Sequence, residues 1–130
     1  MSEATTQAPP ATGTFCWNEL MTHDTEAAKS FYTKLFGWTT REMDMGPQGT
    51  YTIFINKGQD IGGMMACPKK EIPAHWLTYV AVDDVDASTG NALQLGATTC
   101  VPPTDIPNIG RFSVITDPTG STIAMYKSAK

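Results

Sequence analysis

The feature that most limits how this chain can fold is an internal repeat. The stretch from Asp24 to Trp38 has apolar side chains at helical spacing and a glycine near its end, which together predict an amphipathic helix. The stretch from Asp84 to Thr98 repeats this pattern and also begins with an aspartate. A strand-like run precedes each helix, and further strand-like runs follow it. Two copies of roughly sixty residues predict a duplicated domain rather than a solenoid.

Two pairs of glycines extend the repeat downstream of the helices. Gly49 and Gly110 each precede aromatic and aliphatic residues spaced two apart, and Gly58 and Gly120 each close a tight turn before a last strand. The predicted order is therefore βαβββ, twice. We expect strands at 14–22, 38–44, 50–56, 60–67, 75–82, 97–101, 111–116 and 121–127, and helices at 24–36 and 84–95.

This order predicts an α+β fold. Each half has too few strands to bury both faces of its sheet, so the two βαβββ modules, residues 14–67 and 75–127, should form a curved mixed sheet around a cavity, with the helices outside. Phe31 and Leu35 of the first helix should be buried against the outer face of the sheet. The proline-bracketed segment 68–73 is a predicted linker. Its length permits closure within one chain or exchange between two chains, so a homodimer stays open.

Composition narrows the partners and the compartment. The formal net charge is −4 and no basic patch is present, which argues against nucleic acid and anionic membranes as partners. No apolar run approaches the roughly 18 residues needed to span a bilayer. Residues 1–13 lack the basic start and apolar core of a secretory signal and are expected to be a disordered tail. Cys16, Cys67 and Cys100 are widely spaced, which favours a reduced, cytoplasmic protein without disulfides or zinc.

Several of these runs resemble those of the vicinal oxygen chelate superfamily, which includes glyoxalase I, the extradiol dioxygenases and the bleomycin- and fosfomycin-resistance proteins. The similarity rests on the run SFYTKLFGW at 30–38, the turn DPTG at 117–120, a Trp-x-Glu-Leu first strand and a Gly-Arg-Phe seventh strand. It covers residues 14–127 and implies a single glyoxalase/bleomycin-resistance-like domain. Because one fold here hosts many chemistries, it does not imply one reaction.

The resemblance also implies where a metal would bind. In metal-dependent members, one side chain from each of four strands holds a divalent ion in the cavity. Carried over by spacing, these positions fall on Trp17, Gly62, Leu77 and Ala124. None of the four side chains can ligate a cation, which needs imidazole, carboxylate or thiolate. We therefore expect neither the family metal nor another cofactor.

Two polar residues are candidates for chemistry in the cavity. Glu19 shares the strand face of Trp17, so it is a ligand contact or a general base, or else a structural partner of Arg111 or a threonine. His75 lies two residues before Leu77 and is a ligand contact or base at the rim, or an ordinary strand-end histidine.

The remaining candidates would shape the cavity. Trp17, Tyr79 and Tyr126 are aromatic walls for a flat ligand, or plain core. Gly62 and Gly63 mark a bulge or a close approach, and should open space at the metal position. Arg111 is a carboxylate clamp or a solvated edge charge. The predicted ligand-binding set is Trp17, Glu19, Gly62, His75, Leu77, Tyr79, Arg111, Ala124 and Tyr126.

Two hypotheses of function follow. The first is a metal-free protein that binds a small molecule in the concave pocket. The second is an enzyme of the lyase or dioxygenase type. It would use Glu19 and His75 as unconventional metal ligands with help from another chain, or Glu19 alone as a cofactor-free base. The sequence leaves open whether the protein is an enzyme.

Overall fold

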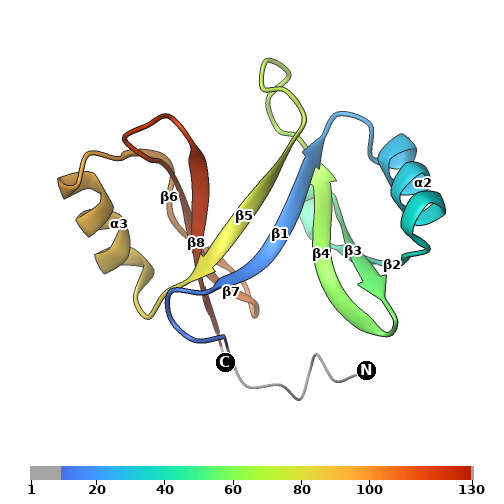
Figure 1. Ribbon diagram of the computed structural model, residues 1–130, viewed down its shortest axis with the longest axis horizontal. Helices are drawn as coiled ribbons and strands as arrows, with labels where there is room; N and C mark the ends of the chain where they lie inside the picture. The colour runs from blue at the N-terminus through green and yellow to red at the C-terminus, as the bar shows by residue number, and fades with distance from the viewer. Residues whose placement is uncertain (1–9, 130) are drawn as a thin grey trace. The chain divides into compact units, whose positions relative to one another are not determined.

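The computed structural model describes residues 10–129, which fall into two compact units. Unit 1 is Trp17–Trp76, and unit 2 combines residues 10–16 with residues 77–129. Figure 1 labels the helices and strands of both units. Each unit follows one copy of the repeat.

Unit 1 contains the first helix and the first four strands. Its elements are β1 (Phe15–Thr22), α2 (Thr25–Phe36), β2 (Thr39–Asp44), the short 3-10 turn η1 (Gly46–Gln48), β3 (Thr50–Asn56) and β4 (Gln59–Ala66). The strands are ordered β2-β3-β4-β1. β1 and β4 run parallel, and the other neighbouring pairs are antiparallel.

Unit 2 repeats this arrangement. Its elements are β5 (His75–Ala81), whose first two residues belong to unit 1, α3 (Val85–Gln94), β6 (Thr98–Ile106), β7 (Gly110–Thr116) and β8 (Thr122–Ser128). The strands are ordered β5-β8-β7-β6, and the parallel pair is again the first strand with the last, β5 with β8. The predicted α+β class, two βαβββ modules with mixed sheets, is confirmed. That the sheets enclose a cavity stays a prediction.

The two helices begin in the same way. Asp24 and Asp84 are N-caps, and the side chain of each accepts a hydrogen bond at 3.0 Å from the amide three residues later. Such a cap satisfies a backbone donor that the first helical turn would otherwise leave without a partner. Gly37 ends α2 in the left-handed conformation, with φ of 75°. The aspartates and this glycine are the signals that the sequence offered.

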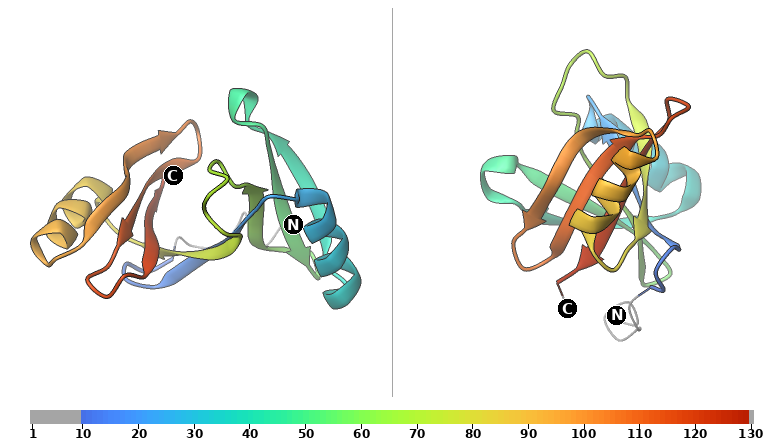
Figure 2. Two further views of the ribbon diagram at one scale, coloured as in Figure 1. Left: turned by 90° about the horizontal axis from the view of Figure 1, so that it is seen from above. Right: turned by 90° about the vertical axis from the view of Figure 1, so that its left-hand side faces the viewer.

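The core of unit 1 lies between α2 and one face of its sheet. Leu20, Phe54 and Met64 are buried there, and Ala28 and Tyr32 of α2 pack against them. Figure 2 shows α2 lying along one face of this sheet only.

The prediction that Phe31 and Leu35 are buried is wrong. Their side chains are 58% and 57% exposed. The ring of Tyr32 takes the place against the sheet, with contacts to Trp38, Phe54 and Trp76. Ala28 and Tyr32 form the flank of the apolar stripe that packs against the core, and Phe31 and Leu35 lie toward its other flank, outside the core.

The core of unit 2 contains a polar contact under its helix. Val85 and Thr89 are the buried residues of α3. The Thr89 hydroxyl lies 2.8 Å from the hydroxyl of Ser113, which has no exposed surface, and also donates to the carbonyl of Val85. These contacts satisfy both buried hydroxyls.

Strand β6 is longer than the sequence predicts. It was expected to end at Val101, but it continues through Pro102 and Pro103 to Ile106. Its register with β7 shifts twice, between Thr99 and Val101 and again before Thr104. β6 is the edge strand of its unit, where prolines are tolerated because one side of the strand needs no ladder hydrogen bonds.

The predicted disordered tail, residues 1–13, lies largely outside the described residues, which begin at residue 10. Within the described part, the Thr12 hydroxyl donates to Asp83 and the Gly13 amide donates to the carbonyl of Ala81. Residues 12 and 13 are therefore bonded to unit 2. No helix in residues 10–129 is long and apolar enough to cross a membrane.

Candidate functional site

The predicted site residues lie mainly on the sheet faces that point away from the helices. We call the face of each sheet opposite the helix of its own unit the far face. In unit 1, Leu20 and Met64 are register partners that face α2. Because side chains alternate along a strand, the neighbouring partners Glu19 and Gly63 lie on the far face. Trp17, two residues before Glu19, is on the same face.

A β-bulge in β4 decides which of the two glycines belongs to the far face. Ile55 is the register partner of Asp60, whereas Phe54 pairs with Gly62, so Ile61 is an extra residue in β4. The extra residue turns Gly62 to the α2 side, where an added Cβ would lie 2.8 Å from the carbonyl oxygen of Asn18. The site position that sequence spacing gave to Gly62 therefore belongs to Gly63.

Gly63 is covered by an aromatic side chain from β3. A Cβ added at this position would overlap the phenol group of Tyr51, so the Tyr51 ring lies directly over Gly63. The Tyr51 hydroxyl accepts a hydrogen bond of 2.8 Å from the indole Nε1 of Trp17. The glycine pair does mark a bulge and a close approach, as predicted. It does not open space at residue 63, because Tyr51 fills that space.

The two polar candidates are placed differently. Glu19 is 5% exposed, so its side chain is buried in the far face and little of it reaches solvent. His75 lies on the opposite side of β5 from Trp76, whose indole donates to the Tyr32 hydroxyl on the α2 side. The His75 Nδ1 is 2.8 Å from the carbonyl oxygen of Pro73, which fixes the ring at the start of its strand.

In unit 2, the far face carries an aromatic cluster of buried Tyr79 with partly exposed Phe112 and Tyr126. Tyr79 is 7% exposed and contacts the rings of Phe112 and Tyr126, with centroids 6.5 and 6.4 Å apart. The Tyr126 hydroxyl donates to the carbonyl of Ile109, and burial raises the pKa of this phenol. Ala124, the register partner of Tyr79, has no exposed surface. The expectation that Ala124 borders a void is therefore wrong.

The two far faces show which positions of the repeat correspond. Glu19 beside Gly63 matches Tyr79 beside Ala124, because each is the pair that the parallel strands of its unit bring together. The resemblance implies four metal positions, and by this correspondence they would fall on Trp17, Gly63, Leu77 and Ala124. None of these side chains carries a ligating atom. Among residues 10–129, no three histidine, cysteine, aspartate or glutamate side chains gather as ligands, and the donor set does not fit the family metal.

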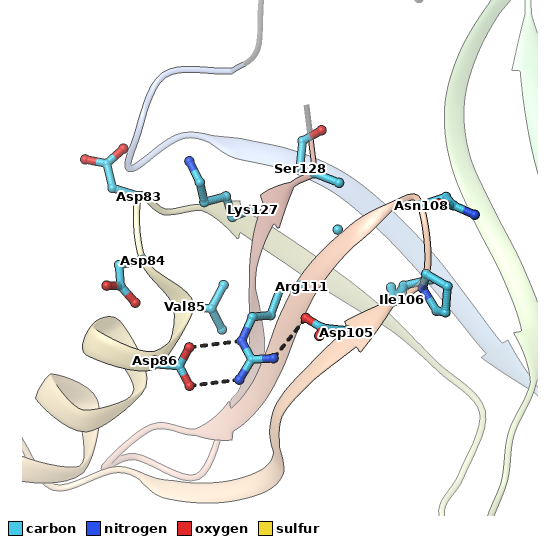
Figure 3. A pocket seen from close by; sticks show the side chains of 13 residues that line it. Asp83, Asp84, Val85, Asp86, Asp105, Ile106, Asn108, Arg111, Lys127 and Ser128 are labelled. Atoms are coloured by element: carbon cyan, nitrogen blue, oxygen red, sulfur yellow. Dashed lines mark hydrogen bonds and ion pairs between the residues drawn. The ribbon is translucent and has the colours of Figure 1, made fainter.

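Arg111 lies on the other face of its sheet. Its guanidinium donates to both carboxylate oxygens of Asp86 on α3 at 2.9 Å, and to Asp105 at 2.9 Å (Figure 3). Hydrogen bonds from Arg111 hold the pKa of the Asp86 carboxyl below its usual value. These bonds connect the β6–β7 hairpin to α3. The guanidinium therefore does not lie on the face of Tyr79 and Tyr126, where a carboxylate clamp was predicted.

These ion pairs border a surface pocket of about 440 Å³ within unit 2. It lies beside the first turn of α3 and is lined by four aspartates, Arg111 and Lys127, among others (Figure 3). Asp84 caps α3, Asp83 accepts from Thr12, and Asp86 and Asp105 bind Arg111. Each of these carboxylates bonds a partner within the chain. The residues that line the pocket therefore stabilise the local structure, and the pocket is not by itself evidence of a ligand.

The predicted set is divided between the units. Trp17, Glu19, Gly62 and His75 belong to unit 1, and Leu77, Tyr79, Arg111, Ala124 and Tyr126 belong to unit 2. That the far-face members converge on one concavity stays a prediction. The sequence analysis missed Tyr51, and it named Gly63 as part of the glycine pair but gave the site position to Gly62. Tyr51 shares its strand alternation with the buried Ile53, which pairs with Gly63, but a ring that leans across a neighbouring strand leaves no trace in spacing.

Comparison with known proteins gives a family and relatives. A model described as "Glyoxalase/Bleomycin resistance protein/Dioxygenase superfamily" matches residues 14–125. CFP32 of Mycobacterium tuberculosis, which is named as a glyoxylase, is 37% identical to this chain over 118 residues. The match covers 91% of this chain and 45% of CFP32. "Anthracycline biosynthesis protein DnrV" of Streptomyces peucetius is 30% identical over 131 residues, covering 90% of this chain and 48% of its own. The chain thus spans about half the length of these relatives.

Solved structures share the fold. Methylmalonyl-CoA epimerase from Mycobacterium tuberculosis has a TM-score of 0.67 at 16% identity, with 95% of this chain and 94% of that chain covered. The Mn(II)-bound glyoxalase from Novosphingobium aromaticivorans has a TM-score of 0.61 at 16% identity, with 89% of this chain and 39% of that chain covered. At such identities the likeness concerns the fold alone.

Proposed function

Since the chain belongs to the glyoxalase/bleomycin resistance protein/dioxygenase superfamily, we propose that it binds a small, mostly apolar molecule on the far face of unit 1 without the family metal. The observation that carries the proposal is the replacement at residue 63. Where metal-dependent members supply a ligand, this chain has a glycine, and the Tyr51 ring fills the space. An aromatic surface with few polar groups is the usual composition of a small-molecule site.

The relatives support this class of function. One is named for anthracycline biosynthesis, and anthracyclines are flat polycyclic molecules. A methylmalonyl-CoA epimerase structure contains methylmalonyl-CoA, which makes an acyl thioester the second class of ligand to compare. The chain itself favours the first class, because two partly exposed aromatic side chains, Trp17 and Tyr51, meet on this face.

The enzyme hypothesis has weaker support. A general base must come within hydrogen-bond distance of the proton that it removes. Glu19, the candidate base, is only 5% exposed, and Tyr51 covers the neighbouring position at Gly63. Turnover of a bound compound remains an outcome that the test below would reveal.

The proposal is tested by thermal unfolding of the full chain against a panel of flat hydroxylated aromatics, non-planar apolar compounds and acyl-CoA thioesters, each in chelator and with added manganese or zinc. A ligand at about 100 times its Kd stabilises the native state by about 2.7 kcal/mol. We expect at least one uncharged compound to raise the melting temperature by several degrees, equally in chelator. Stabilisation only with added metal, or none by any compound, would refute the proposal.

Two further attributes belong to the proposal. The cysteines Cys16, Cys67 and Cys100 are free, which supports a reduced, cytoplasmic setting.

Phe31, Leu35 and Phe36 of α2 are each more than half exposed, a cluster that supports contact with a second copy of the chain. Sedimentation equilibrium of the wild type and of Phe31→Ser/Leu35→Ser checks this. The double substitution should yield monomers, and a monomeric wild type would contradict it.

A further inference from the structure

We infer that Trp17 and Tyr51 form an aromatic floor for a flat, conjugated ligand with a polar edge, and that Gly63 is the residue that makes this floor possible. The inference rests on the proposed function, because it names the ligand class and the residues of the same far face. Gly63 stands at one of the four metal positions that the resemblance implies, whereas Tyr51 stands at none of them.

The geometry fixes the Tyr51 ring. Its phenol carbon and oxygen atoms occupy the space where a side chain at residue 63 would begin, so the ring lies across β4. Any other amino acid at position 63 would collide with the ring and lift it from the sheet. Only glycine, which lacks a Cβ, permits this close approach.

The hydrogen bond fixes the two rings to each other. Trp17 comes from β1 and Tyr51 from β3, and both reach over β4, which separates the two strands in the sheet. The 2.8 Å bond from the indole Nε1 to the phenol oxygen joins the edges of the rings above Gly63. A surface that is held in place before binding loses little side-chain freedom when a ligand arrives.

The residues of the floor are more exposed than the residues beneath and beside it. Trp17 and Tyr51 are partly exposed, whereas Gly63 beneath them and Glu19 beside it are buried. A ligand on this face would therefore contact ring surfaces, and the bonded nitrogen and oxygen would be the nearest polar atoms. Rings favour offset stacking with another π-system. The floor thus fits a planar conjugated molecule that carries hydroxyl or carbonyl groups, such as a hydroxyquinone.

The matching positions of unit 2 do not form such a floor. Phe112 corresponds to Tyr51 in the repeat, but its ring has no hydroxyl, and its neighbour Ala124 carries the Cβ that Gly63 lacks. The Trp17 position is Leu77, which is 3% exposed. The floor is therefore a property of unit 1 and not of the repeated fold.

The test is a calorimetric titration with a dihydroxyanthraquinone, a flat hydroxylated compound, on the full chain. Tyr51→Phe keeps the ring but loses the bonded oxygen, and we expect about 3- to 10-fold weaker binding, as for one lost neutral hydrogen bond. Tyr51→Leu removes the ring, and Gly63→Ala displaces it. Both should weaken binding at least about tenfold. Gly90→Ala is the matched control, because a Cβ there meets open space, and it should bind like the wild type.

The outcomes separate the floor from the proposed function. If Tyr51→Leu and Tyr51→Phe both bind the probe within twofold of the wild type, the floor is wrong while binding on the far face can stand. If the wild type binds only non-planar compounds or acyl-CoA thioesters, the ligand class named here is wrong. Because the Tyr51 substitutions leave Gly63 unchanged, the result does not depend on whether Gly63→Ala folds.

Discussion

The two units of this protein share a scaffold but differ on their far faces. Both begin their helix with an aspartate cap, and both pair their first strand in parallel with their last. On the far face, unit 1 has Glu19 beside Gly63, whereas unit 2 has Tyr79 beside Ala124. Partly exposed rings lie near both pairs, Trp17 and Tyr51 in unit 1 and Phe112 and Tyr126 in unit 2. The Tyr51 ring lies directly over Gly63, whereas Ala124 carries a Cβ. The repeat therefore dictates the backbone, and single residues at matched positions make the two far faces differ.

The same comparison locates the stability of the fold on the helix side of each sheet. Phe54 of unit 1 has no exposed surface and contacts Tyr32 and Trp38, so Phe54→Ala should lower the free energy of unfolding by about 3–5 kcal/mol. Phe31 is 58% exposed, and Phe31→Ala should cost less than about 1 kcal/mol. Urea unfolding of both variants checks this. Equal losses would mean that α2 packs in another orientation.

A second test concerns Ala124, which the sequence placed at a void. With no exposed surface at this position, Ala124→Phe should overpack the far face of unit 2 and cost about 1–3 kcal/mol or more. Chemical denaturation measures the loss. A variant as stable as the wild type would show that a cavity does border Ala124, and the contrast between the two far faces would fail.

The buried hydroxyl pair of unit 2 provides a third test, which has no counterpart among the contacts of α2. Thr89→Val removes the partner of the Ser113 hydroxyl, which has no exposed surface, and should cost about 1–3 kcal/mol. Thr89→Val combined with Ser113→Ala leaves neither hydroxyl and should recover part of the loss. If the double variant is as unstable as the sum of the single variants, the pair is not coupled.

The smallest expected effect is a pH dependence that belongs to unit 2. Hydrogen bonds from Arg111 depress the pKa of Asp86 below its ordinary value of 3.8. A depressed carboxyl pKa contributes stability above the unfolded value, and this contribution is lost as the pH falls through the folded pKa. The difference in melting temperature between wild type and Asp86→Asn should thus be present at neutral pH, begin to fall near the unfolded pKa of 3.8, and vanish only below the lowered folded pKa. A difference that grows in acid would contradict this sign.

The sequence predicted the backbone better than the site. Local signals, such as the Asp24 cap and Gly37, act within a few residues, and they located α2 correctly. Gly62 was assigned to the far face because its spacing from the turn glycine matched that of Ala124. The bulge at Ile61 adds one residue, and with a side-chain period of two, one residue reverses the face.

Two other errors have similarly physical causes. Phe31 and Leu35 follow helical periodicity, but periodicity does not reveal which side of a broad apolar stripe the sheet will take, and Tyr32 took it. Arg111 and Phe112 are neighbours in β7, so their side chains point to opposite faces of the sheet. The partners of Arg111, Asp86 and Asp105, lie in other elements, and sequence spacing does not predict these contacts. Pairings between distant segments depend on the assembled fold, so sequence patterns alone did not specify them.

The central claim, that the accessible ligand surface lies on the far face of unit 1, is tested most directly by tryptophan fluorescence. Trp38 and Trp76 contact Tyr32 on the α2 side, and Trp17 is the tryptophan of the far face. In the variant Trp38→Phe/Trp76→Phe, titration with a dihydroxyanthraquinone in chelator should quench Trp17 saturably, with the Kd found by calorimetry. In the variant Trp17→Phe, saturable quenching should be absent. Saturable quenching of Trp38 or Trp76 with none of Trp17 would contradict the account.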